Sequence, residues 1–296
     1  MGDVTELKTI SLTLPNLPVS NIARPNLVSW LHDRFTRERR VIVVKGPDGS
    51  GKTSLLAQFA HAYPDQCFSY FVGSDSWGAS TRHFLLEMCT QMQFIVGAQQ
   101  QDIDDLGDSE LRQLFMTFYR RVARQARSQR SQFYFVVDGL DWISTESAPS
   151  SILSLLPHDP PEGLYLLAST NPEQVLPFQH DSWPIQFFSP SESEVYFSDI
   201  GFSRDNLNLI YQACQGLPGY QAEIRREVQS GKALADILSN LPMGFRSLLD
   251  RRWKQAQVGD ETTQDALAVL AHTEPKFLIA DLANIVRVEA NVLEDT

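Results

Sequence analysis

Apolar residues are grouped in two ways in the first two thirds of this 296-residue chain. In one group, nearly every residue of a short run is apolar, as at 41–44, 67–73, 132–143, 163–172 and 183–188. In the other, apolar residues recur every three or four positions, as at 27–35, 54–63, 82–92 and 110–125. The first pattern predicts strands buried on both faces, and the second predicts amphipathic helices. Their alternation predicts an α/β fold with a parallel sheet flanked by helices.

The strand pattern ends near the segment FFSPSESE (187–194), and the segments beyond it have helical spacing. This change predicts a domain boundary between residues 189 and 190. We therefore expect a lead-in and helix over 1–36, an α/β domain over 37–189 and a helical domain over 190–240.

The segment GPDGSGKT (46–53) follows the first predicted strand and leads into a predicted helix. Its spacing, Gly-x4-Gly-Lys-Thr, is that of a P-loop, in which glycines let backbone N–H groups surround a phosphate. The helix that follows adds unpaired N–H groups and the positive end of its dipole. The alternative is a glycine-rich turn that only connects strand to helix. The residues expected to bind nucleotide here are Gly46, Pro47, Asp48, Gly49, Ser50, Gly51, Lys52, Thr53 and Ser54.

Two acids follow the third apolar run, in the segment FYFVVDGLD. Asp138 closes the strand, where an acid that coordinates Mg²⁺ is expected if this strand lies beside the P-loop strand. We expect the Thr53 hydroxyl to be the second protein ligand of that Mg²⁺. Lys52, Asp138 and Asp141 form the predicted catalytic set, with Asp141 orienting or deprotonating the attacking water. The alternative for both acids is a structural role in the turn.

Composition narrows the class of partner. The formal net charge is −11, and an acidic chain is a poor general binder of nucleic acid, so nucleic acid is not expected as a partner. No apolar run approaches the roughly 18 residues that would span a bilayer, and the N-terminus lacks the pattern of a secretory signal. Three widely spaced cysteines predict neither a disulfide framework nor a zinc site, which favours a reducing, cytoplasmic setting.

Further motifs appear in a characteristic order: NIARPNLVSWL (21–31), the P-loop, VVDGLD (136–141) and ACQGLPGY (213–220). In this order they resemble the nucleotide-binding module of STAND-class P-loop NTPases, in particular the NACHT branch, which is close to NB-ARC. The resemblance implies that ATP or ADP binds with Mg²⁺, that Arg24 lies near the base or ribose, and that Pro218 contacts the adenine side. It also implies that residues 241–296 begin a winged-helix domain.

Proteins of this kind act as slow ATPases that switch signalling, immune defence or cell death, so protein partners (sensor or effector components) or homo-oligomers are implied.

Three departures from the family pattern bear on activity. Trp142 stands where many relatives have Glu, which argues against fast hydrolysis, and Asn171 stands where an Arg usually senses the γ-phosphate. His272 lies in the expected winged-helix domain, but not where the family's phosphate-reading histidine lies.

Two other functions remain open. The strand-end sequence STN at 169–171, together with Arg246, is also typical of AAA+ ATPases of origin-recognition or loader type that act on DNA. A site that binds nucleotide without hydrolysing it would instead make the protein an adaptor. The segment YRRVARQARSQR (119–130) carries five arginines and is either a docking face or a solvated helix face.

Overall fold

The protein divides into two compact units, Met1–Gln186 and Phe187–Thr296, in the computed structural model. Each unit is described here by itself. The structure describes residues 11–17, 20–35, 39–72, 80–97, 103–143, 151–239 and 241–256. Most of the predicted winged-helix segment (257–296), including His272, lies outside these residues.

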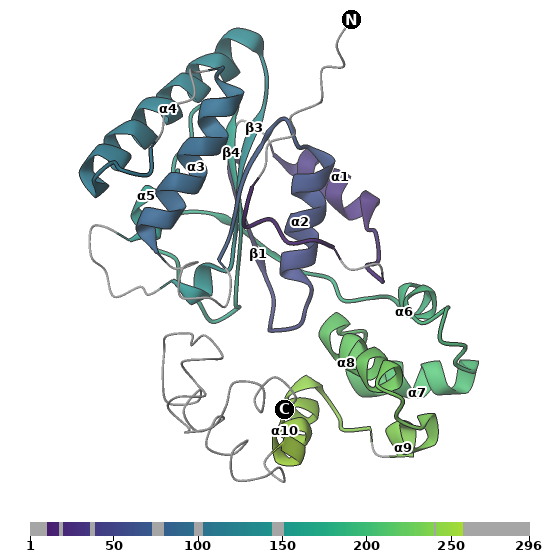
Figure 1. Cartoon of the computed structure of the whole chain (residues 1–296). Coiled ribbons are helices and arrows are strands. Elements are labelled where there is room, and N and C mark those ends of the chain that lie inside the picture. Colours follow the sequence, from purple (N-terminus) through teal and green to yellow (C-terminus); the bar gives the residue numbers. More distant parts are fainter. Residues whose placement is uncertain are drawn as a thin grey trace, which may run out of the picture. The chain divides into compact units, whose positions relative to one another are not determined.

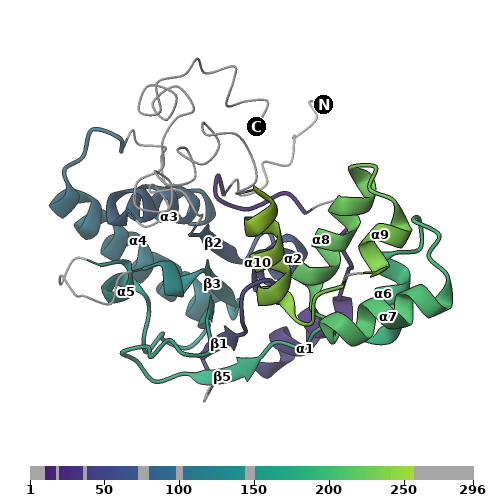
Figure 2. The same ribbon diagram turned by 90° about the horizontal axis from the view of Figure 1, so that it is seen from below.

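A parallel five-stranded sheet forms the centre of the first unit. Its strands are β1 (Val41–Lys45), β2 (Cys67–Phe71), β3 (Phe133–Asp138), β4 (Leu164–Thr170) and β5 (Asp181–Pro184). They pair in the order β2-β3-β4-β1-β5, with every neighbouring pair parallel. Figure 2 shows the labelled strands β2, β3, β1 and β5 following one another in this sense. The predicted α/β fold class is confirmed.

Two details of the predicted sheet are wrong. The strand that ends at Asp138 does not lie beside the P-loop strand, because β4 pairs with both β1 and β3 and separates them. The fifth strand, expected at 183–188, lies at Asp181–Pro184 instead. This strand pairs on one side only and alternates between half-buried and exposed residues, so the apolar run that marks buried strands is absent from it.

Helices cover both faces of the sheet (Figure 1). Helices α1 (Pro25–Arg34) and α2 (Lys52–Ala62) lie on one face, and α3 (Thr81–Ile95) and α4 (Asp108–Gln129) lie on the other. A short 3₁₀ turn, η1 (Leu140–Trp142), and helix α5 (Ile152–Leu155) follow β3. The same strands therefore pack against helices on both faces, and the core has one apolar layer on each side of the sheet.

Strand β3 illustrates how the two layers form. Its Phe133, Phe135 and Val137 belong to the apolar cluster shared with α3 and α4. The intervening Tyr134 packs edge-on against Phe59 of α2, with ring centroids 5.1 Å apart. Because side chains alternate across a strand, a strand covered on both faces is apolar at nearly every position, and β3 is apolar from Phe133 to Val137.

The N-terminal lead-in covers the outer edge of β2. The Ser11 hydroxyl donates to the Ser69 carbonyl over 3.0 Å, and the Phe71 amide donates to Thr13 Oγ1 over 3.0 Å. The Leu12 amide donates to the Glu87 carboxylate over 2.7 Å. The bonds to Ser69 and Phe71 satisfy backbone groups that the edge strand would otherwise expose to another chain.

The second unit is helical in its described residues. It contains α6 (Pro190–Tyr196), α7 (Arg204–Cys214), α8 (Pro218–Gln229), α9 (Leu234–Ser239) and α10 (Phe245–Ala256). Helix α6 begins with a capping box, in which Ser189 Oγ accepts from the Glu192 amide and the Glu192 carboxylate accepts from the Ser189 amide. Residues such as Phe197, Ile210, Tyr220, Ile224 and Leu248 form a separate apolar core.

Gly216, in the Gly-Leu-Pro motif, lets two backbones approach closely. Its carbonyl accepts from the Phe188 amide over 2.9 Å, and a Cβ at this position would lie 2.1 Å from the Phe188 carbonyl oxygen. Its φ of +80° is also one that side chains rarely adopt. The glycine of this motif therefore has a packing role within the second unit.

We expect Gly216→Ala to destabilise the second unit by about 2–4 kcal/mol, because the clash with Phe188 adds to the backbone strain. The matched control is Gly231→Ala, where φ is +84° but nothing lies within 4 Å of the added methyl. That change should cost only about 1–2 kcal/mol of left-handed strain. Urea unfolding of both variants tests this, and equal losses would contradict the packing role of Gly216.

Among the described residues, no helix is both long enough and apolar enough to cross a bilayer.

Candidate functional site

The loop between β1 and α2 begins at a glycine that has no room for a side chain. The Gly46 amide donates to the Thr170 carbonyl at the end of β4 over 3.3 Å. A Cβ on Gly46 would lie 2.5 Å from Ile185 Cγ2 and 2.6 Å from Ser50 Oγ. The loop therefore starts pressed against the sheet, between the ends of the neighbouring strands.

Two further glycines give the loop its curvature. Gly49 and Gly51 have φ values of +74° and +90°, and Gly51 is the N-cap residue directly before α2. The Ser50 amide donates to the Pro47 carbonyl over 3.2 Å, while Pro47 and Asp48 are exposed. A helix that starts directly behind such a turn presents unpaired N–H groups at the loop, which favours an anion there. Ser54 follows in the first turn of α2.

Lys52, the first residue of α2, folds back over this loop. Its ammonium donates to the Gly46 carbonyl over 2.7 Å, the Pro47 carbonyl over 3.3 Å and Asn171 Oδ1 over 3.0 Å. Asn171 follows the last residue of β4. The lysine thus connects the loop with the neighbouring strand, and neutral oxygens are its partners.

Asp138, at the end of β3, is 4% exposed and accepts two hydroxyl hydrogen bonds. Thr53 Oγ1 donates to Asp138 Oδ2 over 2.6 Å, and Ser169 Oγ donates to Asp138 Oδ1 over 2.5 Å. Ser169 also accepts from the Gly139 amide over 2.9 Å. Ser169 lies on β4 between the two strands of the site; the sequence analysis noted it only as part of the segment STN and did not predict its bond to Asp138. A buried hydroxyl in an otherwise apolar strand was the available signal.

Burial raises the pKa of Asp138 above its ordinary value, and the charge of Asp141 adds to the rise. The hydrogen bonds from Ser169 and Thr53 and the ammonium of Lys52 act in the opposite direction. A nearby cation would favour the ionised carboxylate for the same reason as Lys52 does. A divalent cation bound here would therefore stabilise the ionised form of Asp138.

Three buried polar atoms at this edge of the sheet have no hydrogen-bond partner among the described residues: Ser50 Oγ, Asp141 Oδ1 and Thr170 Oγ1. Such groups are rare in folded proteins and call for an explanation. A hydroxyl–carboxylate pair suits Mg²⁺, which prefers oxygen ligands, and the glycine-lined loop with its lysine suits phosphates. The residues present therefore fit a nucleotide with Mg²⁺.

Arg24 and Pro218, the two remaining residues predicted to bind nucleotide, form no described contact with Lys52, Thr53 or Asp138. The Arg24 amide donates to Gln58 of α2 over 2.8 Å, and its guanidinium donates to the Gln186 carbonyl over 2.7 Å. These bonds hold Arg24 beside the middle of α2. Pro218 is the first residue of α8 and belongs to the second unit, so the structure describes it within that unit only.

Comparison with known protein families and curated proteins bears on the class of protein to which this chain is similar. A family model described as an AAA ATPase domain matches residues 24–168. A search of curated proteins finds no significant match. Taken with the parallel sheet and the loop before α2, this match over part of the chain supports the coarser class, a P-loop NTPase.

Among solved structures, the Walker-type ATPase of Pyrococcus abyssi is 13% identical, with 92% of this chain and 91% of that chain covered and a TM-score of 0.54. A STAND protein with a tetratricopeptide repeat sensor from Pyrococcus horikoshii is 14% identical, with 92% and 37% covered and a TM-score of 0.46. Cdc6p from Pyrobaculum aerophilum is 12% identical, with 76% and 66% covered and a TM-score of 0.45. At these identities, the likeness to the first structure concerns the fold alone.

Proposed function

We propose that this protein is a nucleotide-dependent switch of the STAND/NACHT type, which binds ATP or ADP with Mg²⁺, hydrolyses ATP slowly and thereby controls assembly or partner binding. The observation that carries the proposal is the contact between Thr53 and Asp138, made directly behind Lys52 and the glycine loop. It joins a hydroxyl from the P-loop helix and an acid from a strand that is not the P-loop strand's neighbour.

The proposed roles follow from the contacts. The amides of Gly49, Ser50 and Gly51 donate to the phosphates, with Gly46 holding the loop against the sheet. Lys52 exchanges its carbonyl partners for phosphate oxygens, which form stronger, charge-assisted hydrogen bonds. Thr53 and Asp138 hold Mg²⁺, which neutralises charge on the phosphates when bound. Asp141, with one buried carboxylate oxygen unpaired, orients the attacking water.

Arg24 and Pro218 are proposed contacts of the base and ribose. The amide of Arg24 bonds to Gln58 and so fixes the start of α1 to α2, while its guanidinium is held by the Gln186 carbonyl. Pro218 belongs to the other unit. Exchange of ADP for ATP shifts a balance between two conformations only to the extent that the two nucleotides bind them with different affinity.

Slow hydrolysis is proposed because of the residue that follows Asp141. Trp142 is 61% exposed and supplies no group that takes a proton from water. We expect Trp142→Glu to raise the rate of phosphate release at least about tenfold, because a positioned general base contributes about 10²–10⁴-fold. Trp142→Gln is the matched control, of equal length and without a base. A Glu variant no faster than the Gln variant would contradict this account of slow turnover.

The test of the switch combines two measurements. The nucleotide that co-purifies with the protein is extracted and identified, and particle mass is then measured with ADP and with a non-hydrolysable ATP analogue. We expect ADP in the purified protein and a larger assembly after exchange. If both nucleotides bind and the particle mass does not change, the proposal of a switch is contradicted, and only the proposal of a nucleotide-binding site remains.

A second candidate function is favoured by the bond between Lys52 and Asn171. An Asn at the end of β4 that touches the P-loop lysine is suited to sensing the γ-phosphate, as in AAA+ ATPases of origin-recognition or loader type that act on DNA. In that case DNA binding should be measurable at low salt and fall steeply as salt is raised. Absence of DNA binding at low salt would remove this candidate.

The third candidate function is that of an adaptor that binds nucleotide without hydrolysing it, and measurements of nucleotide binding and phosphate release distinguish it from the other two. Its signature is nucleotide binding together with phosphate release no faster than that of Lys52→Ala. Clear turnover above that background would exclude it.

A further inference from the structure

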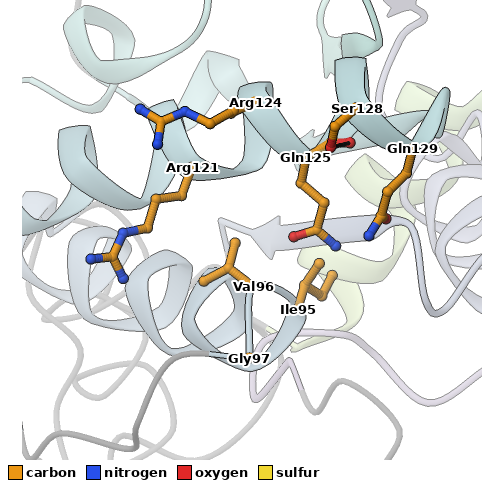
Figure 3. A pocket seen from close by; sticks show the side chains of 8 residues that line it. All are labelled: Ile95, Val96, Gly97, Arg121, Arg124, Gln125, Ser128 and Gln129. Atoms are coloured by element: carbon orange, nitrogen blue, oxygen red, sulfur yellow. Dashed lines mark hydrogen bonds between the residues drawn. The ribbon is translucent and has the colours of Figure 1, made fainter.

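A groove of about 560 Å³ lies between the end of α3 and the C-terminal half of α4, on the sheet face opposite α2. Ile95 and Val96 form its floor and pack against the core below. Gln125 and Gln129 point from α4 toward Ile95, and Arg121 and Arg124 continue the same wall (Figure 3). None of the residues proposed to bind nucleotide lines it.

Positively charged side chains gather on and beside the helix that forms the wall of this groove, and Arg121 and Arg124 line it. Arg120, Arg121, Arg124, Arg127 and Arg130 are all exposed, and none of them forms an ion pair within the described parts of the chain. Arg121 lies over the ring of Phe118, with its guanidinium carbon 5.9 Å from the centroid. In a chain with a net charge of −11, four such arginines on α4 and Arg130 directly after it form a local field of opposite sign.

The side chains that line the groove limit the kind of ligand that it could bind. The arginines suit carboxylates, because a guanidinium matches a carboxylate with two parallel hydrogen bonds. The apolar floor suits an aliphatic side chain, and the amides of Gln125 and Gln129 suit a peptide backbone. None of the described residues that line the groove is aromatic, so none of them offers a ring on which a nucleic-acid base would stack. We propose that this groove docks an acidic, leucine-bearing peptide segment of a partner protein.

The proposal goes beyond the nucleotide site and does not depend on it, so binding should occur with and without nucleotide. The probe is a fluorescein-labelled peptide of about 14 residues, with Glu at about half of its positions and Leu at helical spacing. Fluorescence anisotropy with the full chain in about 50 mM salt measures its affinity, since higher salt screens exposed charges. Comparison probes replace each Leu by Ser, replace each Glu by Lys, or are single-stranded and duplex DNA of similar length.

A matched pair of variants locates the site. Arg121→Glu with Arg124→Glu reverses the two arginines that line the groove. Arg120→Glu with Arg127→Glu makes the same change in net charge on the same helix, at two arginines that do not line the groove. Far-UV circular dichroism and thermal unfolding check that both remain folded, and Gln replacements are used if the Glu variants do not.

We expect the Leu–Glu peptide to bind, the groove variant to weaken it at least about tenfold, and the control variant to change it by less than about threefold. Several outcomes would overturn the proposal. These are no binding of the peptide, equal binding of the Ser-substituted peptide, equal weakening by the control variant, or tighter binding of DNA that the groove variant abolishes. The last result would make this face a nucleic-acid surface.

Discussion

Replacing Lys52 by alanine is expected to weaken Mg–ATP binding by roughly 10- to 150-fold, because each hydrogen bond to a charged group contributes about 1.5–3 kcal/mol. The ammonium reaches the loop carbonyls of Gly46 and Pro47 and the side chain of Asn171. No other cation among the described residues shares these three partners. Isothermal titration calorimetry with ATP and with ADP measures the loss.

Lys45→Ala is the matched control, since it removes the same charge seven residues earlier in the chain. The Lys45 ammonium donates to the Gln174 carbonyl over 3.1 Å, away from the loop. It should leave nucleotide affinity within about threefold of that of the wild type. Wild-type affinity in Lys52→Ala would contradict the assignment of the phosphate site. Equal losses in both variants would indicate a long-range charge effect instead.

Replacing Asp138 by asparagine is expected to abolish the dependence of nucleotide binding and turnover on Mg²⁺, with turnover falling about 10²-fold or more. The amide keeps the shape of the side chain, so Thr53 and Ser169 retain a partner. It does not carry the negative charge that attracts the cation. Titration of Mg²⁺ in the presence of a constant ATP concentration measures the effect, and an unchanged Mg²⁺ requirement would contradict it.

The same variant should be more stable than the wild type when no ligand is bound. Burial raises the pKa of Asp138, so ionisation costs the folded state more than the unfolded state. Below the unfolded-state pKa of about 3.9 the carboxyl is protonated in both states and this cost is absent. As pH rises through the unfolded-state pKa and on to the raised folded-state pKa, stability is lost, and asparagine avoids that loss.

Thermal unfolding in EDTA tests the sign. Asp138→Asn should have the higher Tm at pH 7 to 8, by about 2–4 °C for each 1 kcal/mol recovered, and the advantage should shrink toward pH 4. Asp65→Asn, at an exposed position, is the control and should show no such trend. A lower Tm for Asp138→Asn at neutral pH would mean that the two hydroxyl bonds outweigh burial.

The local parts of the site were predictable because they are local in sequence. Gly46, Gly49 and Gly51 lie within six positions and are followed directly by Lys52 and the helix, so their spacing alone predicts the loop. The buried strands were equally visible, since β1, β3 and β4 are covered on both faces and are apolar at almost every position. The position of β5 was not, because a half-exposed edge strand lacks that run.

Non-local parts of the site were predicted only in part: the motifs paired Thr53 with Asp138, but they gave neither the strand order nor the contact with Ser169. Thr53, Asp138 and Ser169 come from three elements separated by up to 116 positions in the chain, from 53 to 169, and meet only because β4 enters between β1 and β3. The order of strands in a sheet is set by how the connecting helices pack on its faces, which no single segment records. The contact between Lys52 and Asn171 has the same origin.

The amino-acid sequence by itself determined that this chain forms a parallel α/β sheet with a phosphate-binding loop, because apolar patterning and glycine conformation act over a few residues. Only the tertiary structure decided which strand stands beside the loop, which hydroxyls hold Asp138 and which arginines of α4 line a groove over Ile95 and Val96. These features depend on contacts between distant segments, and the free energy that selects among such contacts belongs to the packed molecule as a whole.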